Sequence, residues 1–215
     1  MKNLVLSSLC LLLLGGCAAS LLNNTQRLPE AALTTVEITP WFQGEDNPVL
    51  YKANVDFYRN HFSGLMVIKP VSDESHRVLF ITELGIKIFD LELFRNGDYN
   101  LHYCLDALNK KSVVRTLKND LALMIYHRPD KDKNMKAYVN PLNDRIIFRQ
   151  RTGLGARYYF KRADRTNADT IIQTSCTGKK VNLQFYGMTD NLIDSVMISH
   201  YKLKLDIHIT ALHEK

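Results

Sequence analysis

Apolar and polar residues alternate with a period of two along most of the chain from Leu50 onward. Successive side chains of a β-strand point to opposite faces, so this alternation predicts strands with one buried face. The clearest stretch is KLKLDIHIT near the C-terminus, and looser examples are RVLFITE, IKIFDLELF and RIIFRQR. The apolar residues that share one side of the first stretch are Leu203, Leu205, Ile207 and Ile209. The chain is therefore expected to form a sheet that is apolar on one side.

One segment has helical periodicity instead. In SVVRTLKNDLALMIYHRP the apolar residues recur three and four positions apart, and Pro129 follows them. These apolar positions are Val113, Val114, Leu117, Leu121, Met124 and Ile125. The spacing predicts an amphipathic helix of about four turns, inserted in a series of strands. We expect this helix to pack on the apolar side of the sheet.

The order of these elements indicates a fold class. Turn-forming residues separate the alternating runs, and Asn96-Gly97 between two of them is the strongest hairpin pattern in the chain. About ten consecutive antiparallel strands that are apolar on one side cannot stay flat, so the sheet must twist and curl around that side. The predicted class is α+β, mostly β: a curled antiparallel sheet that forms an unclosed half barrel with an inserted amphipathic helix.

The N-terminus has the pattern of an export signal. Lys2 precedes an apolar run that is too short to span a bilayer, and Leu14-Gly15-Gly16-Cys17 follows. These four residues resemble the lipobox of bacterial lipoproteins, which implies that Cys17 is acylated and becomes the new N-terminus. The alternative is a plain secretory signal with an accidental cysteine. The predicted organisation is a signal peptide at 1–16, a lipidated N-terminus and linker at 17–47, and a single half-barrel domain at 48–215.

Composition limits the partners of the mature chain. Cleavage before Cys17 removes Lys2 and no acidic residue, leaving a net charge of about +5. This excess is typical of proteins beside anionic lipid and is far below that of nucleic-acid-binding proteins. The residue directly after Cys17 is Ala18 and not an aspartate, which by resemblance to lipoprotein sorting rules implies the outer membrane, facing the periplasm. The expected partners are therefore the membrane, through the N-terminal lipid, and a lipid or acyl-chain ligand, with no nucleic acid. Whether an envelope protein is also a partner is left open by the sequence.

Two other cysteines remain in the mature chain, Cys104 and Cys176. An oxidising compartment would allow them to pair, whereas a core of this size does not need a disulfide. The sequence leaves both alternatives open.

Together these features resemble the LolA/LolB-like family of bacterial lipoproteins. The stretch HFSGLMVIKP, followed by HRVLFITELGIKIFDLEL, is similar to outer-membrane lipoproteins near that superfamily. The resemblance covers roughly residues 50 to 126 and depends on strand periodicity with Gly64 and Gly85. It implies binding of lipids or lipoprotein acyl chains inside an unclosed barrel. The protruding hydrophobic loop of the outer-membrane acceptor has no counterpart that the sequence reveals.

The apolar side of the sheet supplies the candidate ligand-binding residues. They are Leu65, Val67, Val78, Phe80, Leu203, Leu205 and Ile207. The alternative is that these side chains fill a dry core, which is the commoner fate of such residues.

A basic segment offers a second candidate surface. Between Arg145 and Arg165 there are six arginines and Lys161 against one acid, Asp164. Alternation predicts that four of the cations point outward, and these are Arg145, Arg149, Arg157 and Lys161. The segment is either a rim that meets phospholipid head groups or an ordinary solvated face of three strands.

Motifs of catalysis and metal binding are absent from the sequence. The seven histidines form no His-x-x-x-His pair, and no Gly-x-Ser-x-Gly elbow occurs. Asp90 and Glu92 share a strand face, but outward acids two residues apart are common. We therefore expect no catalytic residue, no metal and no cofactor.

The sequence leads to two main hypotheses and a weaker third. The first is a membrane-anchored lipoprotein that binds a hydrophobic ligand in lipid or lipoprotein handling. The second is a scaffold or accessory subunit of an envelope complex, with a filled barrel and no ligand. The third is a hydrolase that acts on an envelope polymer.

Overall fold

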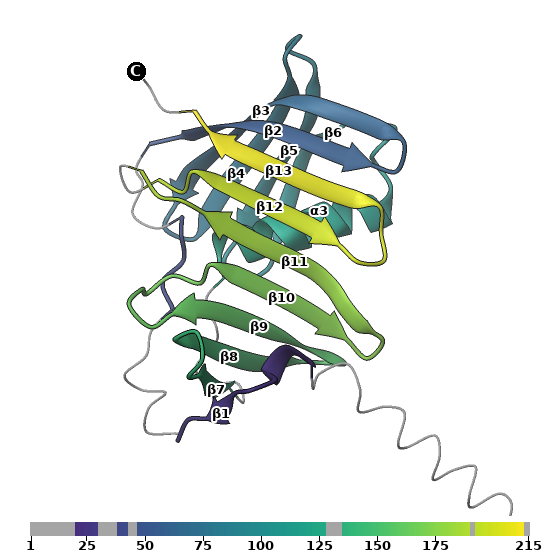
Figure 1. Cartoon of the computed structure of the whole chain (residues 1–215). Helices are drawn as coiled ribbons and strands as arrows, with labels where there is room; N and C mark the ends of the chain where they lie inside the picture. The colour runs from purple at the N-terminus through teal and green to yellow at the C-terminus, as the bar shows by residue number, and fades with distance from the viewer. Residues whose placement is uncertain (1–19, 30–37, 43–46, 128–134, 190–191, 213–215) are drawn as a thin grey trace, which may run out of the picture. The chain divides into compact units, whose positions relative to one another are not determined.

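The computed structural model describes residues 20–29, 38–42, 47–127, 135–189 and 192–212. Within these ranges thirteen strands follow one order, β1-β7-β8-β9-β10-β11-β12-β13-β2-β3-β4-β5-β6. The order is linear, so the sheet is unclosed, and Figure 1 labels its strands. The predicted class of an unclosed, mostly antiparallel sheet with one inserted α-helix is confirmed for the part of the chain that the structure describes.

The chain divides into two compact units. Unit 1 comprises Met1–Ile38 and Pro129–Asn182, and unit 2 comprises Thr39–Arg128 and Leu183–Lys215. Strand β11 (Gly178–Tyr186) contributes residues to both. The prediction of a single domain at 48–215 stays a prediction, and each unit is described by itself.

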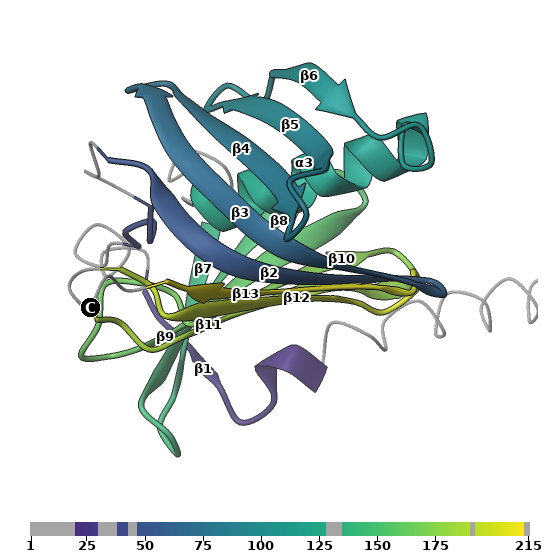
Figure 2. The same cartoon turned by 90° about the horizontal axis from the view of Figure 1, so that it is seen from above.

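Unit 2 is a curled antiparallel sheet with a helix on its concave side. Its strands are β2 (Val49–Phe57), β3 (Asn60–Ser72), β4 (Ser75–Thr82), β5 (Lys87–Phe94), β6 (Tyr99–Cys104), β12 (Ser195–His200) and β13 (Leu205–Ala211). The helix is α3 (Lys111–Ile125), close to the predicted range. Figure 2 shows β3, β4 and β5 curving over α3. The helix thus covers the apolar face that the alternation of these strands creates.

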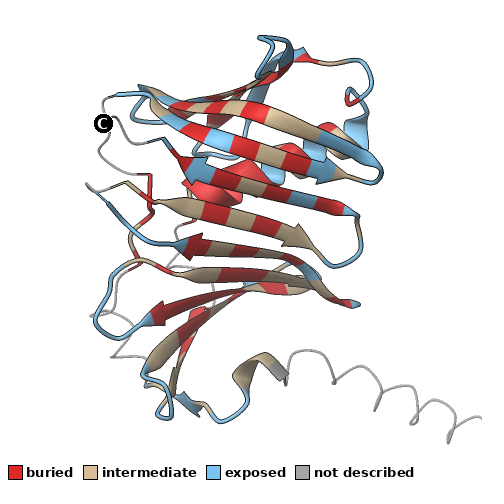
Figure 3. Cartoon of the chain, turned by 45° about the horizontal axis from the view of Figure 1, so that its top comes forward, coloured by how far each residue is buried: buried red, intermediate tan, exposed pale blue. Residues whose placement is uncertain are grey.

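Alternation is regular along most strands of unit 2. In β13 the odd-numbered residues from Leu205 to Ala211 are buried and the others are not. Figure 3 shows the same alternation of buried and exposed positions along neighbouring strands. The predicted hairpin at Asn96-Gly97 is confirmed as the connection between β5 and β6, where Gly97 has φ of 96°. That left-handed backbone is favourable for glycine.

Unit 1 contains four longer strands and a short one. They are β1 (Gln26–Arg27), β7 (Met135–Asn140), β8 (Arg145–Thr152), β9 (Gly155–Arg162) and β10 (Thr170–Ser175). The pairs β1–β7, β7–β8, β8–β9 and β9–β10 are all antiparallel. One face carries an apolar cluster of Ile147, Ala156, Tyr158, Phe160 and Ile172.

The segment that precedes β1 covers this cluster. A short 3₁₀ helix, η2 (Ser20–Leu22), places Leu21 and Leu22 against it, and β1 then pairs with β7. The range 17–47 was predicted as linker, and for residues 20–28 that prediction is wrong. The reason is that Leu21 and Leu22 find an apolar surface, which the weak periodicity of this range does not reveal.

The predicted outward face of four cations in unit 1 is also wrong. Arg149 lies opposite Tyr158 in the register, on the face that carries the apolar cluster. Arg157 and Lys161 lie on the other face, and Lys161 is buried with its ammonium donating a hydrogen bond to the Arg165 carbonyl. Odd-numbered residues of β8 share a face with even-numbered residues of β9. Alternation within β8 therefore does not predict which residues of β9 lie on the same face.

Candidate functional site

The concave face of unit 2 is built from rows of apolar residues in register. One row runs across four strands, from Tyr51 to Met66, Phe80 and Phe89. All four side chains are buried. Aromatic and β-branched pairs across antiparallel strands stabilise a sheet and hold its register. Two members of this row, Phe80 and Phe89, lie beside Val113 and Leu117 of the helix.

An apolar pocket lies between this face and α3. Its lining consists of Val55, Phe57, Phe62, Phe80, Ile88, Phe89, Leu108, Val113, Leu117 and Leu205. Every lining residue is apolar, and several of them, such as Phe57 and Val113, are only half-buried, so the pocket reaches the surface. The free volume inside it is about 20 Å³, which is close to the space that one water molecule needs. In the described state the helix therefore fills the half barrel.

Four of the seven predicted ligand-binding residues lie on this face. Phe80 and Leu205 line the pocket. Val78 is buried two residues from Phe80, and Ile207 is buried opposite Val55, which also lines the pocket. These four residues remain candidates for contact with a ligand.

The other three predicted residues are placed elsewhere. Leu65 and Val67 are half-buried on the opposite face of β3, because it is Met66 that pairs with Phe80. Leu203 lies in the connection between β12 and β13, outside both strands. Its carbonyl accepts a hydrogen bond from the Leu205 amide. The prediction that these three share the concave face is wrong.

Helix α3 is held unequally at its two ends. Val113 and Leu117, near its start, line the pocket. Lys110 at the N-cap makes no side-chain capping bond, and the first turn contains no acidic residue. A helix start without these features lacks partners for its free backbone amides and for its dipole. The first half of α3 is therefore the less firmly fixed half.

A buried ion pair fixes the middle of the helix. Asp120 Oδ2 lies 3.1 Å from His200 Nε2 on β12, and the two side chains are 6% and 4% exposed. His200 Nδ1 lies 3.1 Å from the Leu205 carbonyl oxygen. Burial acts to lower the pKa of His200, but the hydrogen bond and charge of Asp120 outweigh it and raise that pKa. Both ring nitrogens face acceptors, which favours the protonated ring.

The C-terminal end of the helix is fixed by Tyr126. Its hydroxyl donates to the Leu93 carbonyl on β5 at 2.9 Å and lies 3.0 Å from His76 Nδ1 on β4. Burial raises the pKa of Tyr126 to about 12, so the hydroxyl stays protonated. The last three helical residues, from Leu123 to Ile125, are all buried.

His127 follows directly and is fully enclosed. Its Nδ1 donates to the Met124 carbonyl at 2.9 Å, and its ring lies 5.2 Å from that of Phe185. Phe185 in turn stacks on Trp41. Burial lowers the pKa of His127 to about 4, which keeps the ring neutral near pH 7.

Several site residues were absent from the predictions although the sequence contains a signal for them. Asp120 falls on the apolar stripe of the helix, three residues after Leu117, and a charge there implies a buried partner. Val55 and Phe57 alternate with polar residues just as the predicted residues do. For the partner His200 the sequence contains no such signal, because its contact with Asp120 joins residues that are distant in the chain.

Asp90 and Glu92, the two acids that share a face of β5, both interact with neighbouring side chains. Arg77 donates two hydrogen bonds to Asp90, at 2.7 and 2.8 Å, and Lys87 donates a third. Glu92 accepts a hydrogen bond from Ser75 and pairs with His102. The hydrogen bond from Arg77 is the main reason that the pKa of Asp90 lies below its ordinary value. This network covers the outer face of β4 and β5.

The cysteines, the metal-ligating residue types and the helices give further information about what the protein can bind. Cys104 is buried, Cys176 is exposed, and both are free thiols. No group of three or more His, Cys, Asp or Glu residues is arranged to hold a metal ion in the described part of the chain. Among the same residues, no helix has the length and apolar character that crossing a membrane requires.

The turn between β4 and β5 exposes Leu84 and Ile86, an apolar projection that the sequence did not predict.

Comparisons with known proteins support the fold. No family model and no curated protein matches the sequence. A solved domain from Vibrio parahaemolyticus, assigned to outer membrane lipoprotein sorting, is similar with a TM-score of 0.51 and 9% identity, over 86% of this chain and 87% of that one. A DUF1329 family protein from Desulfovibrio piger has a TM-score of 0.48 at 7% identity, over 86% and 88% of the two chains. A LolA superfamily protein from Nitrosomonas europaea has 0.46 at 6%, over 80% and 87%.

At these identities the likeness concerns the fold and not the activity. The domain from Vibrio parahaemolyticus shares the architecture across most of both chains. The fold that the sequence predicts, an unclosed antiparallel sheet with one inserted helix, is therefore shared with this solved domain.

Proposed function

We propose that this protein is a lipid-anchored lipoprotein of the outer membrane, facing the periplasm, that binds an acyl chain in the half barrel of unit 2. It has no catalytic role in this proposal. The observation that carries the proposal is the wholly apolar lining of the pocket between the concave face and α3. Such a lining binds by burial of hydrocarbon, and each buried methylene of an acyl chain contributes about 0.8 kcal/mol.

The helix must move for a chain to enter. Ligand pockets usually enclose about 300–1,000 Å³, and the free volume here is about 20 Å³. The start of α3 is uncapped and carries Val113 and Leu117, whereas its end is fixed through Asp120 and Tyr126. We infer that an acyl chain displaces the first half of α3, about a hinge near Asp120. The ligand then occupies the space that Val113 and Leu117 fill in its absence.

Acylation at Cys17, which is part of this proposal, would serve the same function. Two or more acyl chains hold a protein stably at a bilayer, so the domain would stay close to the membrane from which its ligand comes. Cys17 itself lies outside the described residues. The exposed Leu84 and Ile86 offer an apolar projection that suits contact with lipid. The similar domain from Vibrio parahaemolyticus, assigned to lipoprotein sorting, agrees with this role.

Lipid extraction and native mass spectrometry of the purified protein test the proposal. We expect acyl lipid to co-purify, and a fluorescent fatty acid to bind and to compete with it. Val113→Lys places a charge at the half-buried start of α3 and should abolish fatty-acid binding. Asn119→Lys is the matched control, because it adds the same charge at an exposed position of the same helix.

Equal binding by the two variants, with both folded by circular dichroism, would contradict the pocket. A protein without bound lipid that also fails to bind the fatty acid would contradict the proposal as a whole. Acylation of Cys17 is measured separately from the intact mass of the membrane fraction.

One observation favours a second function, that of a scaffold in an envelope complex. The half barrel is filled in the described state, as a non-binding scaffold requires. Strand β6 ends the strand order and exposes Tyr99, Leu101 and Tyr103. An edge strand with exposed apolar residues can pair with a partner strand. Cross-linking from β6 to one stoichiometric envelope protein, in a chain that carries no lipid, would support this alternative.

A further inference from the structure

Within unit 1, residues 20–28 are docked on the sheet. Leu21 and Leu22 pack against the apolar cluster that includes Ala156. The chain then turns through Thr25, whose hydroxyl donates to the Leu22 carbonyl at 2.7 Å, and enters β1. The Leu28 amide extends the pairing with β7 by donating to the Ala137 carbonyl at 2.9 Å. Residues 20–28, which we call the strap, are thus joined to the sheet by side chains and by backbone.

Docking of the strap limits the distance between the sheet and the acylated cysteine. Cys17 precedes Leu21 by four residues, and four residues span at most about 14 Å even when fully extended. The Cα atom of Cys17 therefore lies within that distance of the Leu21 Cα atom, whatever path the chain follows. A long flexible tether would let the domain turn freely, whereas a docked strap leaves only residues 17–19 between an acyl group on Cys17 and the strap.

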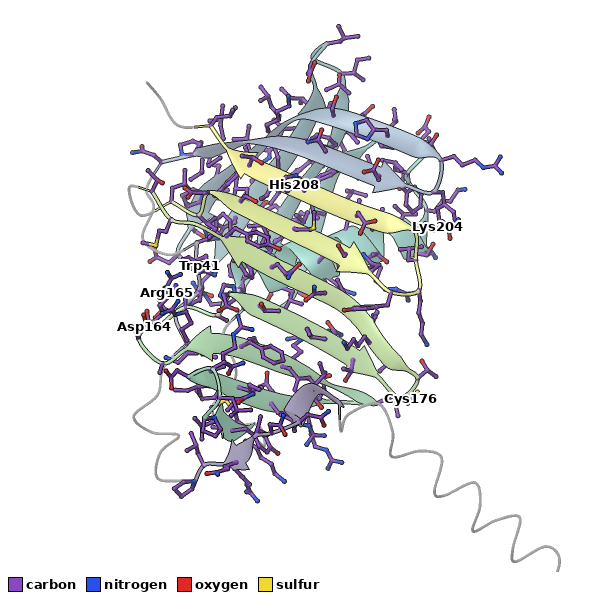
Figure 4. The ribbon with its side chains drawn as sticks, in the orientation of Figure 1. Trp41, Asp164, Arg165, Cys176, Lys204 and His208 are labelled. Carbon is purple, nitrogen blue, oxygen red and sulfur yellow. The ribbon has the colours of Figure 1, made fainter. Side chains whose placement is uncertain are left out.

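In Figure 1, η2 lies toward one end of the unit 1 strands, and that end exposes an apolar residue near several cations. It consists of the β8–β9 turn and the β10–β11 turn, which are adjacent because Gly155 packs against the backbone of Thr174 and Ser175. Leu154, two residues before Ala156, is 83% exposed in the first turn. We call these two turns the Leu154 end, and Figure 4 labels Cys176 there.

Charge distinguishes the Leu154 end from the opposite end. Arg151, Lys179 and Lys180 lie within a few residues of the two turns, on strands that contain no acid. The three acids that the structure describes in unit 1, which are Asp144, Asp164 and Asp169, all lie at the other end. Figure 4 shows Asp164 at that end, away from Cys176.

The opposite end of the unit 1 strands also exposes a leucine, so an exposed leucine alone does not distinguish the two ends. Leu142 in the β7–β8 turn is 77% exposed, but Asp144 follows it and Asp164 lies on the neighbouring turn. Anionic head groups attract the cations of the Leu154 end and are repelled by these carboxylates. Both ends offer an apolar side chain, and among the described residues of unit 1 the Leu154 end has nearby cations and no acid.

We propose that the Leu154 end of unit 1 is the surface that contacts an anionic bilayer, with Leu154 inserted among the acyl chains and Arg151, Lys179 and Lys180 at the head groups. This inference rests on the acylation of Cys17 in the proposed function, and it does not depend on a ligand in the half barrel. The docked strap limits the orientations open to unit 1, because it shortens the chain between the lipid and the domain.

The experiment uses the full acylated protein in vesicles of phosphatidylethanolamine and phosphatidylglycerol. Acylation occupies Cys17 and Cys104 is buried, so an environment-sensitive fluorophore attaches at Cys176. We expect a blue-shifted emission that a quencher carried on the lipid reduces. The same fluorophore at Leu142→Cys, in a chain with Cys176→Ser, should stay unshifted and unquenched.

Substitution at the two leucines provides a matched pair. Leu154→Asn should diminish the quenching at Cys176, whereas Leu142→Asn should leave it unchanged, since both lie in exposed turns where the fold tolerates a polar residue. Replacing Arg151 and Lys180 with Gln should weaken the quenching further, and vesicles of neutral lipid should reproduce that loss. Equal quenching at both ends, or stronger quenching at Leu142→Cys, would overturn the orientation.

Failure of the anchor is distinguishable from failure of the orientation. A chain that is unmodified at Cys17 and stays in the aqueous fraction would remove the anchor, and the orientation with it. An acylated, sedimenting chain with the reversed quenching pattern would remove the orientation alone. Binding of a fatty acid by unit 2 is unaffected in either case.

Discussion

The two units cover an apolar sheet face in different ways. Unit 2 uses α3, whose residues from Leu123 to Ile125 are fully packed. Unit 1 uses the strap, in which Leu21 and Leu22 are only half-buried. Because stabilisation follows the apolar area removed from water, the helix should dominate the stability of its unit and the strap should contribute little. The strap instead lies between Cys17 and the sheet of unit 1, where we propose that it limits how this unit is oriented at the membrane.

The largest expected effect is the loss of the packing of α3. Leu121 is completely buried, and Leu121→Ala should lower the free energy of unfolding of unit 2 by about 2–5 kcal/mol, through lost burial and the cavity that remains. Denaturant unfolding followed by the fluorescence of Trp41, the one tryptophan of the chain, measures this in unit 2. Arg115→Ala, at an exposed position of the same helix, is the control. A loss below that of the control would contradict the dominance of the helix.

Acid should affect the two units differently. All seven histidines lie in the ranges of unit 2. The pKa of His127 is lowered to about 4 from an ordinary value of 6.5, so its contribution is complete above pH 6.5 and is lost as the pH falls toward 4. The loss reaches up to about 3 kcal/mol, at 1.36 kcal/mol per pKa unit. His200 acts in the opposite sense, because its raised pKa makes its contribution complete below 6.5 and removes it as the pH rises through the shifted pKa.

Two probes separate these responses. Trp41 reports on unit 2, and a fluorophore on Cys176 reports on unit 1. Between pH 6.5 and 4 we expect the unfolding midpoint seen by Trp41 to fall further than the midpoint seen at Cys176. His127→Phe should remove most of that difference. An equal fall at both probes, unchanged by the substitution, would show that His127 is not the cause.

A glycine in each unit allows a close approach between strands. A Cβ on Gly64 in β3 would overlap the Ile81 carbonyl, and one on Gly155 in β9 would overlap the Thr174 carbonyl. Gly64→Ala and Gly155→Ala should each cost about 1–3 kcal/mol through backbone shifts. Gly64→Ala should act mainly on the Trp41 signal and Gly155→Ala on the Cys176 signal. If each substitution shifted the unfolding midpoint equally at Trp41 and at Cys176, the two units would unfold as one cooperative unit. Their stabilities could then not be compared separately.

The sequence predicts the elements of unit 2 well because alternation and helical spacing are local. In β13, apolar and polar residues alternate without interruption, and Leu205 and Ile207 are buried as predicted. In β3 the four residues from Leu65 to Ile68 are all apolar, so alternation cannot decide which pair faces inward. Pairing with β4 decides it, by placing Met66 beside Phe80.

The remaining features depend on contacts between distant residues. Leu203 continues the alternation of β13, but the chain has to turn there to join β12, so the strand begins only at Leu205. The ion pair of Asp120 with His200 joins positions eighty residues apart. The strap has no periodicity, and only the cluster around Tyr158 shows where Leu21 and Leu22 belong. Each of these is a property of the packed sheet and not of a local pattern.

The smallest effect concerns the strap itself. Leu22 is half-buried, so Leu22→Ala should cost only about 1 kcal/mol of the stability of unit 1, and should leave the Trp41 signal unchanged. The fluorophore at Cys176 measures it, with exposed Asn23→Ala as the control. The same variant should weaken lipid quenching at Cys176 far more than its stability cost implies, because a released strap adds slack between Cys17 and the sheet. Unchanged quenching in a destabilised Leu22→Ala protein would show that the strap stabilises unit 1 without orienting it. In that case α3 and the strap would differ only in how much stability each contributes to its unit.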